Sequence, residues 1–177
     1  MLRVPVVDGK ERYSLGTVEA HNKLAGIPTR SFTIPCRRLD TFDLSSVGVI
    51  KIDVEGHELA VLEGAQTLLL KDHPSLMIEA EERHRPGTVR EISSYLANFG
   101  YLGFFLVGRR LRPIAEFDVA RYQNAGSISL SEVLPGYVYA NNFVFVRASR
   151  ACRNCLTARC EHWYDLRAAA SQLATPF

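Results

Sequence analysis

Five acidic or histidine side chains, four of them in one short stretch of the sequence, are placed to do chemistry together. Carboxylates and imidazoles can take up or release protons during a reaction, and grouped carboxylates can bind a divalent cation. Burying such groups is unfavourable unless they are paired or used in a reaction. We expect the catalytic residues to be Asp53, Glu55 and His57, and the substrate-binding residues to be Glu58 and Glu79.

Two short apolar stretches must position these residues. Val47–Val54 is β-branched and nearly continuously apolar, which is typical of a buried strand in a parallel sheet, and Ser75–Ala80 is a second such stretch. Asp53 and Glu79 fall at the ends of these strands. Ligands of open parallel α/β sheets bind beyond the carboxyl ends of the strands, and neighbouring strands lie about 5 Å apart. If these two strands are neighbours, their two carboxylates face one crevice.

The segment between the two strands has the pattern of a helix. Apolar residues recur at helical spacing from His57 to Lys71, with acids at the start and a lysine at the end, as the helix dipole favours. Pro74 prevents the helix from continuing. A simpler role for Glu58 is to cap the free N–H groups of the first turn, and His57 alone is compatible with a solvated or capping residue. Both interpretations stay open beside the functional ones.

The rest of the chain adds strands and one more helix. Further strands are predicted at Ser31–Cys36, Tyr101–Val107 and Phe143–Arg147. Cys36 is expected to be a core residue of its strand, and Thr88 and Glu91 have the spacing of a capping box that opens a helix. Strands alternating with helices predict an α/β domain over residues 1–148. Residues 149–177 change to a composition rich in cysteine, arginine and alanine, and we interpret them as a C-terminal tail.

The composition argues against several classes of protein. The 177 residues carry 21 Lys and Arg against 19 Asp and Glu, a net charge of +2, without the basic excess typical of nucleic-acid binders. No apolar run approaches the roughly 18 residues of a membrane helix, and no apolar leader opens the sequence. Four cysteines do not form a disulfide framework in a chain of this length. We therefore expect a cytoplasmic protein that binds neither nucleic acid nor membrane.

Potential metal ligands lie close together in the tail. They are Cys152, Cys155, Cys160 and His162. The first pair has a spacing suited to zinc, but the last two residues are too close together for the usual second pair of ligands. We favour ordinary intracellular thiols in a basic tail over a zinc site.

The stretch IKIDVEGHELAVLEGA, from Ile50 to Ala65, is very similar to the hallmark segment of the FkbM-type methyltransferases. Neighbouring stretches resemble other parts of the same domain: CRRLDTFDL (Cys36–Leu44), PSLMIE (Pro74–Glu79) and NNFVFV (Asn141–Val146). The resemblance extends over residues 1–148. It implies a class I, Rossmann-like fold that uses S-adenosylmethionine to methylate a hydroxyl on a small-molecule acceptor, often a sugar or a polyketide.

The resemblance also assigns places to the acidic residues. Asp53 would follow the fourth strand of such a fold and face both the donor methyl and the acceptor, and Glu79 would end the fifth strand. Glu55, His57 and Glu58 would form the adjoining loop and the start of the helix. Methyl transfer to oxygen is an in-line displacement at a sulfonium carbon, so the acceptor hydroxyl must be aligned and must lose its proton. A carboxylate or a histidine at this place suits both tasks.

The cofactor-binding part of the family's domain has no counterpart in the sequence. A class I domain holds its cofactor with an early strand, a glycine-rich turn and an acid that ends the next strand. No such turn precedes Ser31, and no GxG pair occurs. The chain thus resembles the C-terminal half of the domain, and by itself we expect it not to bind S-adenosylmethionine with useful affinity. A late gene start, a decayed gene and a partner polypeptide are the three explanations.

Two other functions stay open. A metal-dependent hydrolase would use Asp53, Glu55, His57 and Glu79, and a bound divalent ion without methyl transfer would favour it. A non-catalytic interaction module would complete its sheet with another chain. In the chain alone the strand Val47–Val54 becomes an exposed apolar edge, which favours pairing with a partner chain or with a second copy.

Overall fold

The computed structural model describes residues 1–22, 24–129 and 132–148. The chain divides into two units, Met1–Arg147 and Ala148–Phe177, and every helix and strand of the described residues belongs to the first. The zinc candidates of the tail therefore lie outside the described residues: Cys152, Cys155, Cys160 and His162. Within the part of the chain that the structure describes, no helix is long and apolar enough to cross a membrane.

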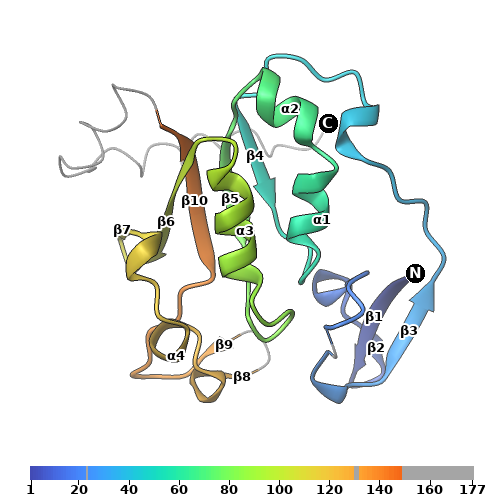
Figure 1. Ribbon diagram of the computed structural model, residues 1–177. Coiled ribbons are helices and arrows are strands. Elements are labelled where there is room, and N and C mark those ends of the chain that lie inside the picture. Colours follow the sequence, from blue (N-terminus) through green and yellow to red (C-terminus); the bar gives the residue numbers. More distant parts are fainter. Residues whose placement is uncertain (23, 130–131, 149–177) are drawn as a thin grey trace, which may run out of the picture. The chain divides into compact units, whose positions relative to one another are not determined.

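A five-stranded mixed sheet forms the centre of the first unit (Figure 1). In spatial order its strands are β4 (Val49–Ile52), β5 (Ser75–Glu79), β10 (Asn142–Arg147), β6 (Tyr101–Val107) and β7 (Arg110–Pro113). β4 and β5 are parallel, whereas β10 is antiparallel to both of its neighbours and β7 is antiparallel to β6. The α/β architecture is confirmed and is compatible with a Rossmann-like fold, but the predicted parallel sheet is mixed because β10 lies between β5 and β6.

β4 lies at the edge of this sheet. Among the described strands only β5 pairs with it, and Val49 is 66% exposed. The strand predicted over Val47–Val54 is therefore shorter than expected, and its outer edge is open. Ile52, on the side that faces the helices, is buried. The apolar pattern thus identified a strand with one buried side chain at its end rather than a strand buried along its length.

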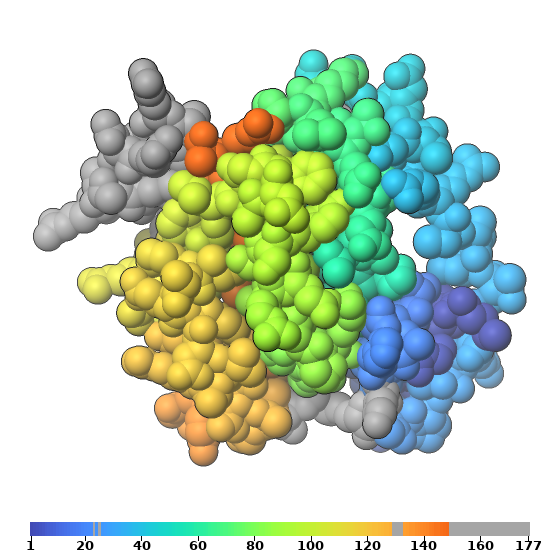
Figure 2. Space-filling model, viewed as in Figure 1, coloured from blue at the N-terminus to red at the C-terminus, as the bar shows by residue number. Residues whose placement is uncertain are grey.

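Three helices cover one face of the sheet, as Figures 1 and 2 show from the same side. They are α1 (Glu58–Glu63), α2 (Gln66–Lys71) and α3 (Thr88–Ala97). The single helix predicted over 57–71 is interrupted after α1. The reason is Asp40, whose carboxylate accepts hydrogen bonds from the backbone N–H groups of Thr67 and Leu68 and so caps α2 separately.

The core lies between these helices and the sheet. Its fully buried residues include Leu62, Leu69, Leu76, Ile78, Ile92, Leu96, Phe105, Phe143 and Phe145. Gly103 in β6 leaves room for the ring of Phe145, since a Cβ atom there would lie 2.6 Å from Phe145 Cε1. Burial of these side chains holds the helices on the sheet and keeps the ends of β4 and β5 in place.

The start of α3 differs from the predicted capping box. The Glu82 carboxylate, in the turn before the helix, accepts hydrogen bonds from the N–H groups of Gly87 and Val89. Thr88 Oγ1 is buried without a hydrogen-bond partner, and Glu91 pairs with the preceding turn instead. A carboxylate that comes earlier in the chain therefore caps this helix.

A small antiparallel sheet, in the order β2-β1-β3, precedes the main sheet in the chain. Its strands are β1 (Leu2–Val7), β2 (Lys10–Glu11) and β3 (Thr29–Phe32). The strand predicted at Ser31–Cys36 ends earlier, because β1 begins at Leu2, opposite Phe32, and Cys36 is exposed rather than in the core. The other α-helix and strands of the described residues are α4 (Val119–Tyr122), β8 (Ile128–Ser129) and β9 (Glu132–Val133).

Candidate functional site

A sharp turn follows β4 at the edge where β5 also ends. We call this turn, residues 53–57, the Gly56 turn. The φ angle is +55° at Glu55 and +106° at Gly56. Residues other than glycine rarely adopt positive φ angles, because their Cβ atom clashes with the backbone there. The Gly56 N–H donates a hydrogen bond of 2.7 Å to the Glu58 carboxylate, which closes the turn.

A loop near the N-terminus holds the Gly56 turn in this shape. In this clamp loop, residues 17–22, Thr17 Oγ1 and Asn22 Nδ2 each donate a hydrogen bond of 2.8 Å to the backbone carbonyl of Glu55. Both donors belong to buried residues. Arg3 of β1 in turn donates hydrogen bonds to the backbone carbonyls of Glu19 and Asn22. Because two buried donors fix the Glu55 carbonyl, the unfavourable backbone conformation is maintained.

The Glu55 carboxyl group faces a histidine from the turn after β5. Glu55 Oε2 lies 3.2 Å from His84 Nδ1, and the two side chains are 17% and 10% exposed. Burial raises the pKa of Glu55 to about 7, and the nearby charges of Glu81 and Asp53 act in the same direction. Burial also lowers the pKa of His84 to about 4. The distance would permit an ion pair if the ring were protonated, but burial disfavours the imidazolium, so the contact joins the carboxyl group to a neutral ring.

Glu81 belongs to a second buried network beside this pair. Its carboxylate accepts hydrogen bonds from Arg83 Nε at 2.6 Å, Arg83 Nη2 at 3.1 Å and the Tyr139 hydroxyl at 2.5 Å. Burial acts to raise the pKa of Glu81, but these hydrogen bonds outweigh burial and the pKa is lowered. Glu81 is therefore held as a charged carboxylate, whereas Glu55 beside it gains and loses its proton near neutral pH.

Asp53 and Glu79 lie on either side of a lysine. Lys51 Nζ is 3.5 Å from Asp53 Oδ2 and 3.4 Å from Glu79 Oε2. Asn141 Nδ2 donates a further hydrogen bond of 2.7 Å to Glu79 Oε1. Burial and the charge of Asp53 raise the pKa of Glu79. The ends of β4 and β5 thus bring these two carboxylates together, at a distance set by the register of the parallel pair.

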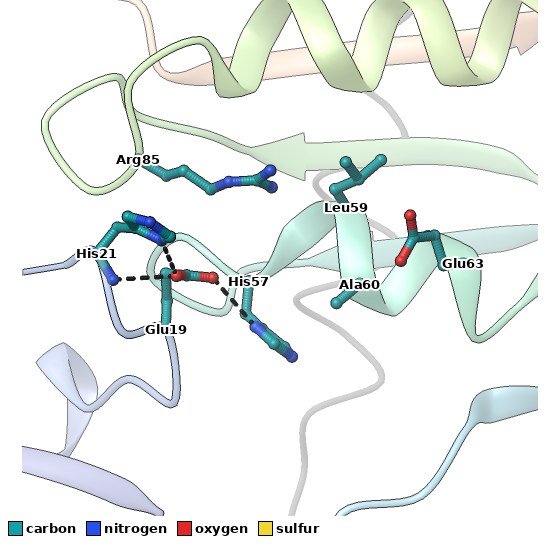
Figure 3. A pocket seen from close by; sticks show the side chains of 7 residues that line it. All are labelled: Glu19, His21, His57, Leu59, Ala60, Glu63 and Arg85. Carbon is teal, nitrogen blue, oxygen red and sulfur yellow. Dashed lines mark hydrogen bonds and ion pairs between the residues drawn. The ribbon is translucent and has the colours of Figure 1, made fainter.

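His57 contacts the clamp loop. Figure 3 shows Glu19 between the rings of His21 and His57, at 2.7 Å and 3.3 Å respectively. Burial acts to raise the pKa of Glu19, but hydrogen bonds from the backbone and side chain of His21 and from His57 outweigh it and lower the pKa to about 2. These side chains border an open hollow of about 240 Å³ whose lining residues are Glu19, His21, His57, Leu59, Ala60, Glu63 and Arg85.

The five predicted site residues therefore divide into separate environments. Asp53 and Glu79 share Lys51, Glu55 faces His84, and His57 faces Glu19. The four-residue metal cluster considered for a hydrolase is not formed, and among the described residues no group of three His, Cys, Asp or Glu side chains is arranged to hold a metal ion.

Glu58 is buried next to the Gly56 turn, apart from the other four residues. It is 1% exposed, and Oε2 of its carboxylate is buried without a hydrogen-bond partner while Oε1 closes the Gly56 turn. Burial raises the pKa of Glu58. The Glu58 carboxylate therefore helps to shape the turn. The sequence predicts that Glu58 binds substrate, but its side chain is not accessible in this structure.

Several residues that build the site are absent from the sequence-based prediction. They are Thr17, Glu19, Asn22, Glu81 and His84. The run that follows β5, AEERHR, is mostly charged and is a signal that could have directed attention to Glu81 and His84. The clamp loop has no such signal, because its contacts with the Gly56 turn join residues more than thirty positions apart in the sequence.

Comparison with known proteins finds a family whose model covers the part of the chain that contains these turns. A family model described as the methyltransferase FkbM domain matches residues 5–102, more than half of the 177 residues. The match runs from β1 to the start of β6 and so includes the clamp loop, the Gly56 turn and the turn after β5. No curated protein and no solved structure gives a significant match.

Proposed function

The chain belongs to the FkbM methyltransferase family, and from this premise we propose that it methylates a hydroxyl group of a small molecule, with S-adenosylmethionine as the methyl donor. The observation that carries the proposal is the Gly56 turn, which lies within the matched family segment and presents Glu55 at the carboxyl ends of two parallel strands. The resemblance of the sequence to a class I arrangement assigns β4 and β5 as its fourth and fifth strands, and their parallel pairing supports that assignment.

The described residues do not fit S-adenosylmethionine as a complete site. Nucleotide-like cofactors of such folds rest on a glycine-rich turn whose free N–H groups point at the ligand. The turn after β4 contains Gly56 alone, and its N–H is already bonded to Glu58. We therefore assign to the described residues only the acceptor side of the reaction, in which a hydroxyl is held and its proton is removed.

Glu55 is the residue best suited to remove that proton. A general base works best when its pKa lies near the working pH, and burial brings the pKa of Glu55 to about 7. Asp53 and Glu79, 48% and 32% exposed at the same edge, are available to accept hydrogen bonds from other hydroxyls of a sugar-like acceptor. His57 is 32% exposed and, held by Glu19, lines the adjacent hollow.

The test is methyl transfer by the protein produced from its natural reading frame, including any in-frame segment upstream of Met1. The protein is incubated with methyl-labelled S-adenosylmethionine and a small-molecule extract of the source cells, and labelled products are identified by mass. Glu55→Gln should lower the rate by about 100-fold or more. Glu116→Gln is the matched control, because Glu116 is an exposed carboxylate paired with Arg112 of β7. A protein that binds the donor but labels nothing would contradict the proposed activity.

The open edge of β4 favours a second function, assembly with another chain. Val49 is 66% exposed on a strand whose outer N–H and C=O groups meet no described strand. Such an edge pairs readily with a strand of a second copy or of a partner. This assembly is compatible with methyl transfer, because the Gly56 turn lies beyond the end of β4 rather than along its edge.

A further inference from the structure

We propose that Glu19 is the positioning residue for His57, and that it leaves Nε2 of the His57 ring free to accept a hydrogen bond from a hydroxyl of the acceptor. The proposal rests on the proposed methyl transfer, because the acceptor is the molecule that would occupy the hollow beside this ring. His57 binds the acceptor there without taking its proton, which stays the role of Glu55.

Backbone bonds and packing hold Glu19 in place. Its N–H donates a hydrogen bond of 3.0 Å to Thr17 Oγ1, and its carbonyl accepts one from Arg3. A Cβ atom on Gly56 would lie 3.1 Å from Glu19 Cγ, so little space separates the side chain from the Gly56 turn. The Glu19 side chain is 12% exposed. These contacts give its carboxylate a defined direction.

The two oxygens of this carboxylate have different partners. Oε1 accepts a hydrogen bond of 3.0 Å from the His21 N–H and lies 2.7 Å from His21 Nδ1, whereas Oε2 is hydrogen bonded to His57 Nδ1 at 3.3 Å (Figure 3). An ionised carboxylate can only accept hydrogen bonds. Glu19, with a pKa of about 2, is ionised at neutral pH. The proton between Glu19 and His57 therefore belongs to Nδ1 of the ring.

This assignment leaves the second ring nitrogen of His57 as an acceptor. In a neutral imidazole one nitrogen carries the proton and the other has a lone pair that accepts a hydrogen bond. The two nitrogens lie on opposite sides of the ring, so Nε2 is turned away from Glu19 (Figure 3). No group of the described residues is hydrogen bonded to Nε2, and the His57 side chain is 32% exposed. A bound molecule can therefore reach this nitrogen.

The hollow that His57 lines suits a small, uncharged group with hydroxyls. Its volume of about 240 Å³ is below the roughly 300–1,000 Å³ of pockets for drug-sized ligands, so it has room for one small ring. Glu19 and Glu63 bring two carboxylates to its lining, whereas the Arg85 guanidinium is already bonded to Glu91 at 2.6 Å. This balance of charge disfavours an anionic ligand group. A hydroxyl is uncharged and donates the hydrogen bond that Nε2 can accept.

Long-range proton–nitrogen NMR spectra of the neutral ring identify which nitrogen of His57 carries the proton. We expect a proton on Nδ1 in the wild type. In Glu19→Gln the His21 N–H still requires an acceptor, so the amide oxygen should stay toward His21 and the NH₂ group should face His57. Nδ1 then becomes the acceptor, and the proton should move to Nε2.

Glu11→Gln is the matched control for this measurement, because Glu11 is an acid of the small sheet that pairs with Arg30. It should leave the proton of His57 on Nδ1. A proton on Nε2 in the wild type, or an unchanged ring in folded Glu19→Gln, would overturn the proposal.

Two variants of His57 test the contact with the acceptor, which the labelling experiment identifies. His57→Asn keeps an N–H donor near Nδ1 for Glu19 but has no atom near Nε2, whereas His57→Gln keeps an oxygen near Nε2. We expect His57→Asn to raise the KM for the acceptor by about 3- to 10-fold, the effect of one lost hydrogen bond, with kcat nearly unchanged. His57→Gln should restore much of the lost affinity, and Glu19→Gln should raise KM as His57→Asn does.

The outcomes separate this proposal from the proposed function. An unchanged KM in His57→Asn, or a fall in kcat alone, would overturn the binding role of Nε2. If the NMR spectra show the expected protons while the protein transfers no methyl group, the proposed function fails and the positioning of His57 by Glu19 stands. If methyl transfer occurs while the wild-type ring carries its proton on Nε2, the reverse holds.

Discussion

Glu19 of the clamp loop and Glu55 of the Gly56 turn belong to neighbouring segments, yet their surroundings shift their pKa values in opposite directions. Their side chains are similarly buried, at 12% and 17% exposure. The pKa of Glu19 is lowered to about 2 and that of Glu55 is raised to about 7. The difference lies in the partners, because Glu19 receives donors from His21 and His57 whereas Glu55 is placed among other acids.

This contrast shows that burial alone does not identify a functional carboxylate. A carboxylate surrounded by donors stays charged at all ordinary pH values and serves to hold structure. One that is buried among acids keeps its proton up to neutral pH, which destabilises the fold at higher pH but suits proton transfer. We assign the first role to Glu19, which anchors the clamp loop, and the second to Glu55.

The largest expected effect comes from a change that disturbs both carboxylates at once. Gly56→Ala places a side chain at a φ of +106° and within 3.1 Å of Glu19 Cγ and 3.2 Å of His84 Cβ. Backbone strain and overpacking together should lower the free energy of unfolding by about 3–5 kcal/mol. Urea denaturation measures this loss. Gly136→Ala is the matched control, since Gly136 also has a positive φ but nothing within 4 Å of a Cβ atom. Equal losses would show that packing at Gly56 is unimportant.

Glu19→Gln tests the structural half of the comparison. A lowered pKa means that Glu19 stabilises the fold above the unfolded value of 4.5, and that this contribution is lost as pH falls toward 2. The variant should therefore be less stable than the wild type at pH 7, by on the order of 2–3 kcal/mol, and equal to it near pH 2. Thermal unfolding across this pH range gives the difference. A constant deficit at every pH would indicate lost packing instead.

Glu55→Gln tests the role of the carboxylate buried among acids, and its expected effect on stability is opposite to that of Glu19→Gln. A raised pKa means that the native protein binds more protons than the unfolded chain between pH 4.5 and about 7, so stability falls as pH rises through this range. Removal of the charge should make the variant more stable than the wild type at pH 8, by on the order of 1–3 kcal/mol, and equal to it at pH 4, as measured by urea denaturation at the two pH values. Reduced stability at pH 8 would show that the Glu55 carboxylate is structural, like Glu19.

The smallest expected effect is at the open edge of β4, on the strand that leads into the same turn. Val49→Lys places a charge on a side chain that is 66% exposed, and should change the stability by less than about 0.5 kcal/mol. A lysine on an edge strand opposes pairing with another strand. If copies of the chain associate through this edge, the variant should dissociate at concentrations where the wild type is dimeric, as measured by light scattering. Identical masses would argue against assembly through β4.

Local patterns in the sequence predicted much of the frame around the site. The apolar runs identified β5 and the neighbouring strand β4, and Tyr101–Val107 is confirmed as β6. These patterns failed where a side chain outside the helix supplies the cap. Asp40 divides the predicted helix into two, and Glu82 replaces Thr88 as the cap of α3. Such contacts form only in the folded chain, and hydrophobic periodicity carries no information about them.

The same limit applies to the site itself. Asp53 and Glu79 could be placed together because parallel neighbouring strands end at one edge. The partner of Glu55 could not be foreseen, because His84 comes from an irregular turn whose direction depends on α3 and on Gln123. The sequence places His57 beside Glu55, but in the structure His57 contacts Glu19 whereas Glu55 contacts His84.

The hydrogen bonds from Arg3 to the clamp loop tie the first strand of the chain to the Gly56 turn. Arg3 holds the carbonyl of Asn22, and Asn22 holds the carbonyl of Glu55. Fraying of β1 would release Asn22 and, with it, the carbonyl that keeps Glu55 in its unfavourable conformation. We therefore expect the small sheet and the Gly56 turn to open together, in one cooperative event. Their backbone amides should then exchange hydrogen at a common rate. The first few residues of β1 therefore help to hold the Gly56 turn in shape, although none of them belongs to it, and their removal would be expected to relax the turn.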